Sequence, residues 1–234
     1  MERDLSTFEE KIGLKFKNKN LLRQVFVHRS YLNENIGFDL DHNERLEFLG
    51  DAILEFLITE YLYKNYPNPE GELTSWRSAL VKGKTLSDLA QSLSMNEYLL
   101  LSRGEAHSSG KARELILANA YEALIGALYL DQGLEVTRNF VEKQFIILLP
   151  NILSKGLHRD PKSLLQEIFQ AQEKITPVYK VMKESGPDHA KKFTIGVFAE
   201  NRLLAEGEGL SKQAAQRDSA QKALKKLGYL KESS

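Results

Sequence analysis

Apolar residues recur at intervals of three and four through almost all of the first 150 residues. This spacing places them on one face of a helix, and the helical stretches are separated by turn-rich segments such as "PNPEG" and "RGEAHSSGKA". The first stretch begins with "STFEEKIG", in which Ser6 and Glu9 have the spacing of a capping box. We therefore expect this part of the chain to form a bundle of helices.

The pattern changes after residue 160. A helical stretch, "PKSLLQEIFQAQEK", is followed by three segments typical of strands: "TPVYKVMKES", "KKFTIGVFAE" and "RLLAEGEG". Helical spacing returns in the last stretch, and there we expect a seam of small and medium side chains to pack on the sheet: Ala220, Ala223, Leu224 and Leu227. The order helix, three strands, helix predicts a compact α+β module of about 70 residues.

Composition and charge narrow the possible functions. The chain has 234 residues, of which 42% are hydrophobic and 27% charged, as in folded domains. Residues 1–159 carry a net charge of −3 and residues 160–234 a net charge of +3, so a polyanion would be attracted to the second part. The absence of cysteine excludes disulfides and thiolate zinc sites. With no apolar run long enough for a membrane and no signal peptide in "MERDLSTFEE", we expect a cytoplasmic protein.

Acidic residues cluster within the stretch "HNERLEFLGDAILEF", residues 42–56. On a helix, Glu44, Glu47 and Asp51 share one face, and Leu46, Leu49, Ile53, Phe56 and Leu57 are expected to form a core stripe on another. A solvated face is one interpretation of the acidic row. However, the row contains no Lys or Arg, and like charges one turn apart destabilise a helix by about 0.2–0.5 kcal/mol each. We therefore expect a compensating partner outside the helix.

A second helical stretch, "ILANAYEALIGALYL", carries Asn119 and Glu122 within an otherwise apolar run, with Gly126 one turn later. A buried carboxylate needs a partner, because an isolated buried charge is too costly for folding. Either a salt bridge or a metal ion would satisfy it. Oxygen ligands without cysteine or paired histidine suit a hard cation such as Mg²⁺ or Mn²⁺, which would support hydrolysis of a phosphodiester.

Several of these stretches resemble the ribonuclease III family. "HNERLEFLGDAIL" is similar to its signature, "PEGELTSWRSALV", "LLLSRGE" and "EALIGALYLDQG" resemble later blocks of its nuclease domain, and the last module resembles a double-stranded RNA-binding domain. The resemblance implies a mainly α fold with an all-helical nuclease domain and an α-β-β-β-α module. The expected boundaries are residues 1–154 for the nuclease domain, 155–160 for a linker, 161–230 for the RNA-binding domain and 231–234 for a tail.

The resemblance also implies roles for individual residues. The catalytic acids would be Asp51 and Glu122 as the essential pair, with Glu47 and Glu44, and the ligands of Mg²⁺, or of Mn²⁺ as a substitute, would be Glu47, Asp51, Asn119 and Glu122. Glu70 matches an acid that joins the cluster in some members. The family implies a homodimer through the signature helix. It also implies hydrolysis of double-stranded RNA, including ribosomal RNA precursors, to 5′-phosphate and 3′-hydroxyl ends with short 3′ overhangs.

One position departs from the family pattern. Asn119 stands where the family usually has Asp, and its amide oxygen can bind a hard cation but carries no charge. We therefore expect weak or Mn²⁺-favouring cleavage that rises when Asn119 is changed to Asp. The alternative is a dimer that binds double-stranded RNA without cutting it.

Contacts with duplex RNA depend on shape, through 2′-hydroxyl and phosphate groups. The resemblance implies that Ser163, Gln166, Glu167 and Gln170 face one minor groove and that His189 enters the next. Lys212, at the N-terminus of the last helix, would bind phosphate. The family usually has further lysines there, whereas this chain has Gln213 and Gln216, so we expect modest and salt-dependent affinity.

Overall fold

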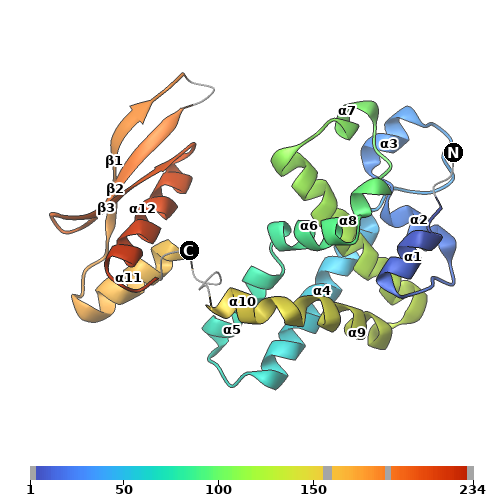
Figure 1. Ribbon diagram of the computed structural model, residues 1–234, viewed down its shortest axis with the longest axis horizontal. Coiled ribbons are helices and arrows are strands. Elements are labelled where there is room, and N and C mark those ends of the chain that lie inside the picture. Colours follow the sequence, from blue (N-terminus) through green and yellow to red (C-terminus); the bar gives the residue numbers. More distant parts are fainter. Residues whose placement is uncertain (1–3, 155–159, 188–190, 231–234) are drawn as a thin grey trace. The chain divides into compact units, whose positions relative to one another are not determined.

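A computed structural model describes residues 4–154, 160–187 and 191–230 (Figure 1). Its contacts divide the chain into two compact units, residues 1–152 and 153–234. We describe each unit by itself.

The first unit is built from helices, as the apolar spacing predicts. Its α-helices are α1 (Ser6–Ile12), α2 (Lys19–Val25), α3 (Arg29–Glu34), α4 (Glu44–Asn65), α5 (Glu70–Leu80), α6 (Gly83–Ser92), α7 (Arg103–Ala106), α8 (Gly110–Gln132), α9 (Leu134–Phe145) and α10 (Leu149–Ser154). Two short 3₁₀ helices, η1 (Met95–Glu97) and η2 (Ile146–Leu148), complete it. The predicted helical bundle is confirmed.

Helix α8 lies at the centre of this unit, where α2, α4, α6 and α9 pack around it. Residues 116–118 and 120–128 are buried except Glu122, which explains why this stretch is apolar on all sides. Two glycines let α4 and α8 approach closely. A methyl group at Gly50 would lie 1.8 Å from the carbonyl oxygen of Glu122, and one at Gly126 would lie 2.2 Å from that of Leu46. Only glycine fits at these two contact points.

The core stripe predicted for α4 is only partly correct. Leu46, Ile53 and Leu57 are buried, Leu49 is half-buried, but Phe56 is 51% exposed. Phe48, eight residues and just over two helical turns before Phe56, is 80% exposed. The spacing could not distinguish buried from exposed apolar residues of α4, because it does not show which side α8 covers. The side that α8 leaves uncovered carries an apolar ridge, Phe48 and Phe56.

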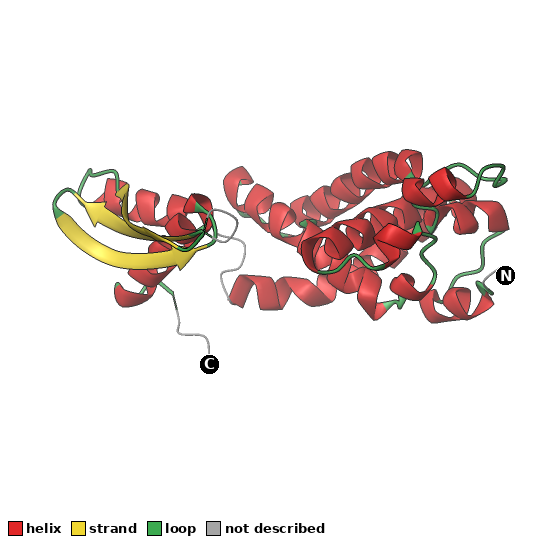
Figure 2. Cartoon of the chain, turned by 90° about the horizontal axis from the view of Figure 1, so that it is seen from above, coloured by secondary structure: helices red, strands yellow, loops and turns green. Residues whose placement is uncertain are grey.

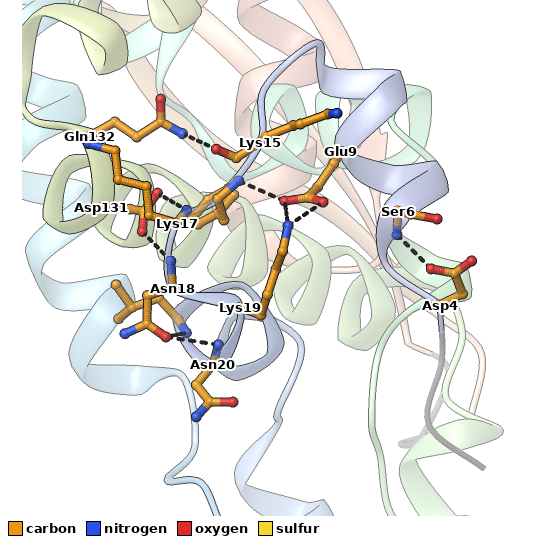
Figure 3. Close-up of polar contacts among 12 residues, drawn as sticks. Asp4, Ser6, Glu9, Lys15, Lys17, Asn18, Lys19, Asn20, Asp131 and Gln132 are labelled. Atoms are coloured by element: carbon orange, nitrogen blue, oxygen red, sulfur yellow. Dashed lines mark hydrogen bonds and ion pairs between the residues drawn. The ribbon is translucent and has the colours of Figure 1, made fainter.

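The predicted capping box at α1 is wrong. The helix begins at Ser6, whose N–H donates to Oδ1 of Asp4 at 2.9 Å, and Glu9 is buried (Figure 3). The Glu9 carboxylate instead accepts a hydrogen bond from the N–H of Phe16 at 2.7 Å and pairs with Nζ of Lys19 at 2.5 Å. Glu9 thus holds the loop between α1 and α2.

The same loop is fastened to the end of α8. The Asp131 carboxylate accepts hydrogen bonds from the N–H groups of Lys17 and Asn18, both at 2.8 Å (Figure 3). Nε2 of Gln132 donates to the carbonyl oxygen of Lys15 at 2.9 Å. These bonds satisfy backbone groups that would otherwise lack partners in the loop.

The second unit has the predicted order α-β-β-β-α. It consists of α11 (Pro161–Gln172), β1 (Val178–Ser185), β2 (Lys192–Ala199), β3 (Arg202–Gly209) and α12 (Lys212–Lys226). The strands form one antiparallel sheet in the order β1-β2-β3 (Figure 1), which is drawn in yellow in Figure 2. The predicted fold class is therefore confirmed.

Both helices of this unit share a core with the sheet. The core contains Leu164, Leu165 and Phe169 of α11, Val197, Ala199 and Leu204 of the sheet, and Ala220, Ala223 and Leu224 of α12. Leu227, which was expected in the same seam, is 43% exposed because α12 ends at Lys226 and Leu227 forms its cap. Small side chains let α12 lie close to the sheet, where a methyl group at Gly207 would meet the backbone of Ser219 at 2.1 Å.

Candidate functional site

The predicted catalytic acids lie on both sides of the contact between α4 and α8. Glu44, Glu47 and Asp51 belong to α4, and Glu122 belongs to α8. Glu47 and Glu122 are half-buried, whereas Glu44 and Asp51 are exposed. The carbonyl of Glu122 touches Gly50, the residue before Asp51, so the close helix contact places acids of both helices beside each other.

The electrostatics show that these four acids interact. Burial, together with the smaller effect of the negative charges of Asp51 and Glu47, raises the pKa of Glu122 to about 8. Burial also raises the pKa of Glu47, with contributions from Glu44 and Asp51. A carboxylate among like charges is a strained arrangement, and perturbed acids of this kind are typical of functional sites.

Asn119 takes part in the same cluster. Its side chain lies near the Glu47 carboxylate and acts to lower the pKa of Glu47, against the rise that burial and the neighbouring acids cause. Aspartate at position 119 would have no amide N–H to donate and would add a charge. Asn119 therefore relieves repulsion in the acidic cluster that an acid at this position would increase.

Glu44 differs from the other three acids because it has basic neighbours. Nη1 of Arg29 lies 3.5 Å from Glu44 Oε1, and Nδ1 of His42 lies 3.7 Å from Oε2. Arg29 on α3 and His42 before α4 thus supply part of the compensating charge that the acids of α4 were expected to need. The spacing of α4 contained no signal for Arg29, because the contact joins segments 15 residues apart.

The residues present fit a hard cation. The oxygen ligands on offer are the carboxylates of Glu47, Asp51 and Glu122 and the amide of Asn119. No basic side chain is among the groups that shift the pKa values of Glu47 and Glu122. In the described part of the chain, no three acids or histidines are close enough to form a complete cation cage. Mg²⁺ does not need such a cage, since it commonly binds one or two carboxylates and keeps several waters.

Glu70 belongs to a different surface. It begins α5, accepts a hydrogen bond from Oγ1 of Thr74 at 2.9 Å and lines a pocket of about 580 Å³ between the end of α4 and α5. The rest of the pocket is lined by Thr59, Leu62, Tyr63, Tyr66, Pro67, Asn68, Leu73, Thr74 and Arg77, and it includes none of the four acids. Within one chain, the structure does not bring Glu70 into the acidic cluster.

In the second unit, four of the predicted RNA contacts lie on the exposed face of α11: Ser163, Gln166, Glu167 and Gln170. His189 lies outside the described residues. Lys212 is the first residue of α12, after the N-cap Ser211, and its Nζ lies 3.5 Å from Oε1 of Glu184 and 5.6 Å from the centre of the Phe193 ring.

Comparisons with known proteins support both units. Residues 18–149 match the family model described as "Ribonuclease-III-like", and residues 161–227 match "Double-stranded RNA binding motif". None of the helices in the described part of the chain combines the length and apolar character that a membrane span requires.

Full-length relatives align over almost the whole chain. Ribonuclease 3 of Protochlamydia amoebophila is 46% identical over 96% of this chain and 93% of its own, and that of Desulforamulus reducens is 44% identical over 93% and 89%. Among solved structures, the nuclease domain of ribonuclease III from Campylobacter jejuni is 35% identical. It has a TM-score of 0.56 and covers 63% of this chain and 99% of its own.

The helical domain, its acidic cluster and the RNA-binding motif after it define a ribonuclease III type endoribonuclease. The chain belongs to the ribonuclease III family.

Proposed function

We propose that this enzyme hydrolyses phosphodiester bonds of double-stranded RNA with the help of Mg²⁺ or Mn²⁺, leaving 5′-phosphate and 3′-hydroxyl ends. We propose that its substrates are ribosomal RNA precursors and other structured transcripts, and that it acts in the cytoplasm. The observation that carries this proposal is the electrostatic coupling of Glu47, Asp51 and Glu122 across the contact between α4 and α8.

The acidic cluster has the chemistry to hold a divalent ion. Glu47, Asp51, Asn119 and Glu122 would be its ligands, directly or through water. When bound, such an ion supplies orientation of a water molecule toward the phosphorus atom and stabilises negative charge on the leaving oxygen. The protein contributes a fixed geometry, because the backbones of α4 and α8 are in contact at Gly50 and Gly126.

The second unit is proposed to bind the duplex. Ser163, Gln166, Glu167 and Gln170 offer exposed hydrogen-bonding groups for a minor groove, and Lys212 offers an ammonium group at a helix N-terminus. His189 is proposed as a contact from the resemblance alone.

We further propose that two chains form a homodimer through α4. Phe48 and Phe56 expose 80% and 51% of their surface on one face of this helix, where water-exposed aromatic rings favour a protein partner. The solved Campylobacter structure is described as showing structural flexibility in a region involved in dimer formation of that protein. A second copy would cover the ridge.

Cleavage of a labelled RNA duplex, followed on a denaturing gel, tests the proposal. We expect cleavage with Mg²⁺ or Mn²⁺ and none with a chelator or in Glu122→Gln. A native gel of the same samples separates binding from cutting. Duplex that is retarded but remains uncut in both metals would select the alternative, a non-cleaving RNA-binding dimer.

A further inference from the structure

Lys162, in the first turn of α11, has an ammonium group held in a defined place. Its Nζ donates a hydrogen bond to Oε1 of Gln216 on α12 at 2.7 Å and lies 4.9 Å from the centre of the Tyr179 ring on β1. Three elements therefore determine its position. A lysine held in this way loses less conformational freedom when it meets a ligand than a freely rotating one.

The charge of Lys162 is not neutralised by these partners. Gln216 is neutral, and burial raises the pKa of Tyr179 to about 12, so its phenol also stays neutral. Among the described residues, no ion pair joins the Lys162 ammonium to a carboxylate. The neighbouring acid, Asp160, caps α11 and accepts from the backbone N–H of Lys162. In contrast, Lys212 is already paired with Glu184.

The ammonium lies between the two described contact regions of the proposed RNA surface. Gln216 follows Lys212 by one helical turn on the same face of α12, and Ser163 directly follows Lys162 on α11. A cation at this place can reach a phosphate of a duplex that touches both helices.

We propose that Lys162 is a phosphate contact for duplex RNA, which supplies from α11 the positive charge that Gln216 does not supply on α12. Gln216 and Tyr179 position the ammonium, and the phosphate completes its hydrogen bonds. This inference rests on the proposed binding of duplex RNA by the second unit. Lys162 is not among the RNA contacts proposed above, and the inference assigns part of the affinity for duplex RNA to it.

Lys180 provides a matched control. It is the next residue after Tyr179, its Nζ also lies over an aromatic ring, that of Phe198 at 5.1 Å, and it points to the opposite face of the sheet because successive strand residues alternate. Both lysines can be changed to Met, which keeps the apolar stem on the ring and removes the charge.

The experiment measures binding of the full chain to a fluorescent RNA duplex in chelator, across a range of salt concentrations. We expect Lys162→Met to weaken binding on the order of tenfold and to lower the slope of log affinity against log salt by about 1. Lys162→Arg should keep most of the affinity and slope, and Lys180→Met should differ from wild type by less than about twofold.

An unchanged affinity and slope in Lys162→Met would overturn the inference while leaving the proposed function intact. Equal weakening by Lys162→Met and Lys162→Arg, or by Lys180→Met, would also overturn it, because the effect would then not belong to this charge. If the wild-type chain itself fails to bind duplex RNA, the proposed function fails first. Thermal unfolding of each variant shows whether the module is folded, and Lys162→Gln, which also removes the charge, takes the place of Lys162→Met if that variant is not folded.

Discussion

Gly50 lies directly against the carbonyl oxygen of Glu122, so that a methyl group at Gly50 would stand 1.8 Å from that oxygen. Gly126 makes the reciprocal contact with the backbone of α4. These contacts set the distance between α4 and α8, and therefore the distance between the acids that the two helices carry. The geometry of the acidic cluster therefore depends on two residues that have no side chain.

Gly50→Ala is expected to destabilise the nuclease unit by about 3 kcal/mol or more, because backbone cannot yield as a flexible side chain can. The melting temperature and the cleavage rate should fall together. Gly83→Ala is the matched control, since a methyl group there meets no atom within 4 Å. Equal stability of Gly50→Ala and wild type would show that the helices are not held at this distance.

Glu122→Gln should abolish cleavage and stabilise the metal-free protein at alkaline pH. The pKa of Glu122 is about 8 in the folded protein against 4.5 as its ordinary value. Between these values the folded state keeps a proton that the unfolded state loses, so the free energy of unfolding falls as pH rises from 4.5 to about 8.

Thermal unfolding in chelator at several pH values measures this effect. The melting temperature of Glu122→Gln should exceed that of wild type by several degrees at pH 8 and approach it near pH 4.5. A parallel pH dependence in the two proteins would contradict the assignment of a raised pKa to this residue.

Asn119→Asp is expected to raise the cleavage rate in Mg²⁺ on the order of tenfold, because aspartate adds a charged ligand. The same change removes the amide that favours the charged form of Glu47 and adds repulsion, so the metal-free variant should unfold at a lower temperature. Single-turnover cleavage and thermal unfolding, each with and without metal, test both parts. A full wild-type rate in Mg²⁺ with no gain in the variant would contradict the role given to Asn119.

Glu184→Gln should tighten RNA binding by roughly twofold to fivefold at low salt, since the carboxylate competes with phosphate for Lys212. The pKa of Glu184 is lowered mainly by its bond with Lys191 and also by Lys212, so the acid is charged at neutral pH. Glu206→Gln, a change of an exposed acid on β3, controls for net charge. Fluorescence anisotropy would detect the difference, and equal tightening by both variants would remove any special role of Glu184.

Phe48→Ser is expected to weaken the proposed homodimer by at least about 30-fold, because a central aromatic anchor commonly contributes about 2 kcal/mol or more. The change should leave the fold of the single chain intact, since the ring is 80% exposed. Sedimentation over a range of concentrations measures the association. Ile147→Ser, at a residue that is 76% exposed on η2, is the control, and a dimer unaffected by Phe48→Ser would argue against α4 as the interface.

Local pattern in the sequence was enough for the elements and for the candidate acids. Apolar spacing predicted the helices, alternation in "KKFTIGVF" predicted β2, and the spacing of Glu44, Glu47 and Asp51 placed them on one helix face. These features follow from the period of a helix or strand, which neighbouring residues determine. The same spacing could not show that Phe56 is exposed or that Glu9 holds a loop, because both depend on distant segments.

Tertiary structure alone decided which side chains meet. It paired Glu44 with Arg29, brought Asn119 to Glu47 and placed the ammonium of Lys162 beside Gln216. Such contacts depend on the distance and rotation between packed elements, and these are set by side-chain volumes across the whole core. The sequence by itself therefore determined the chemical groups and the helix faces that carry them. The packing of α4 on α8 and of α11 on α12 decided the distances between these groups and, through burial, the pKa values of the acids.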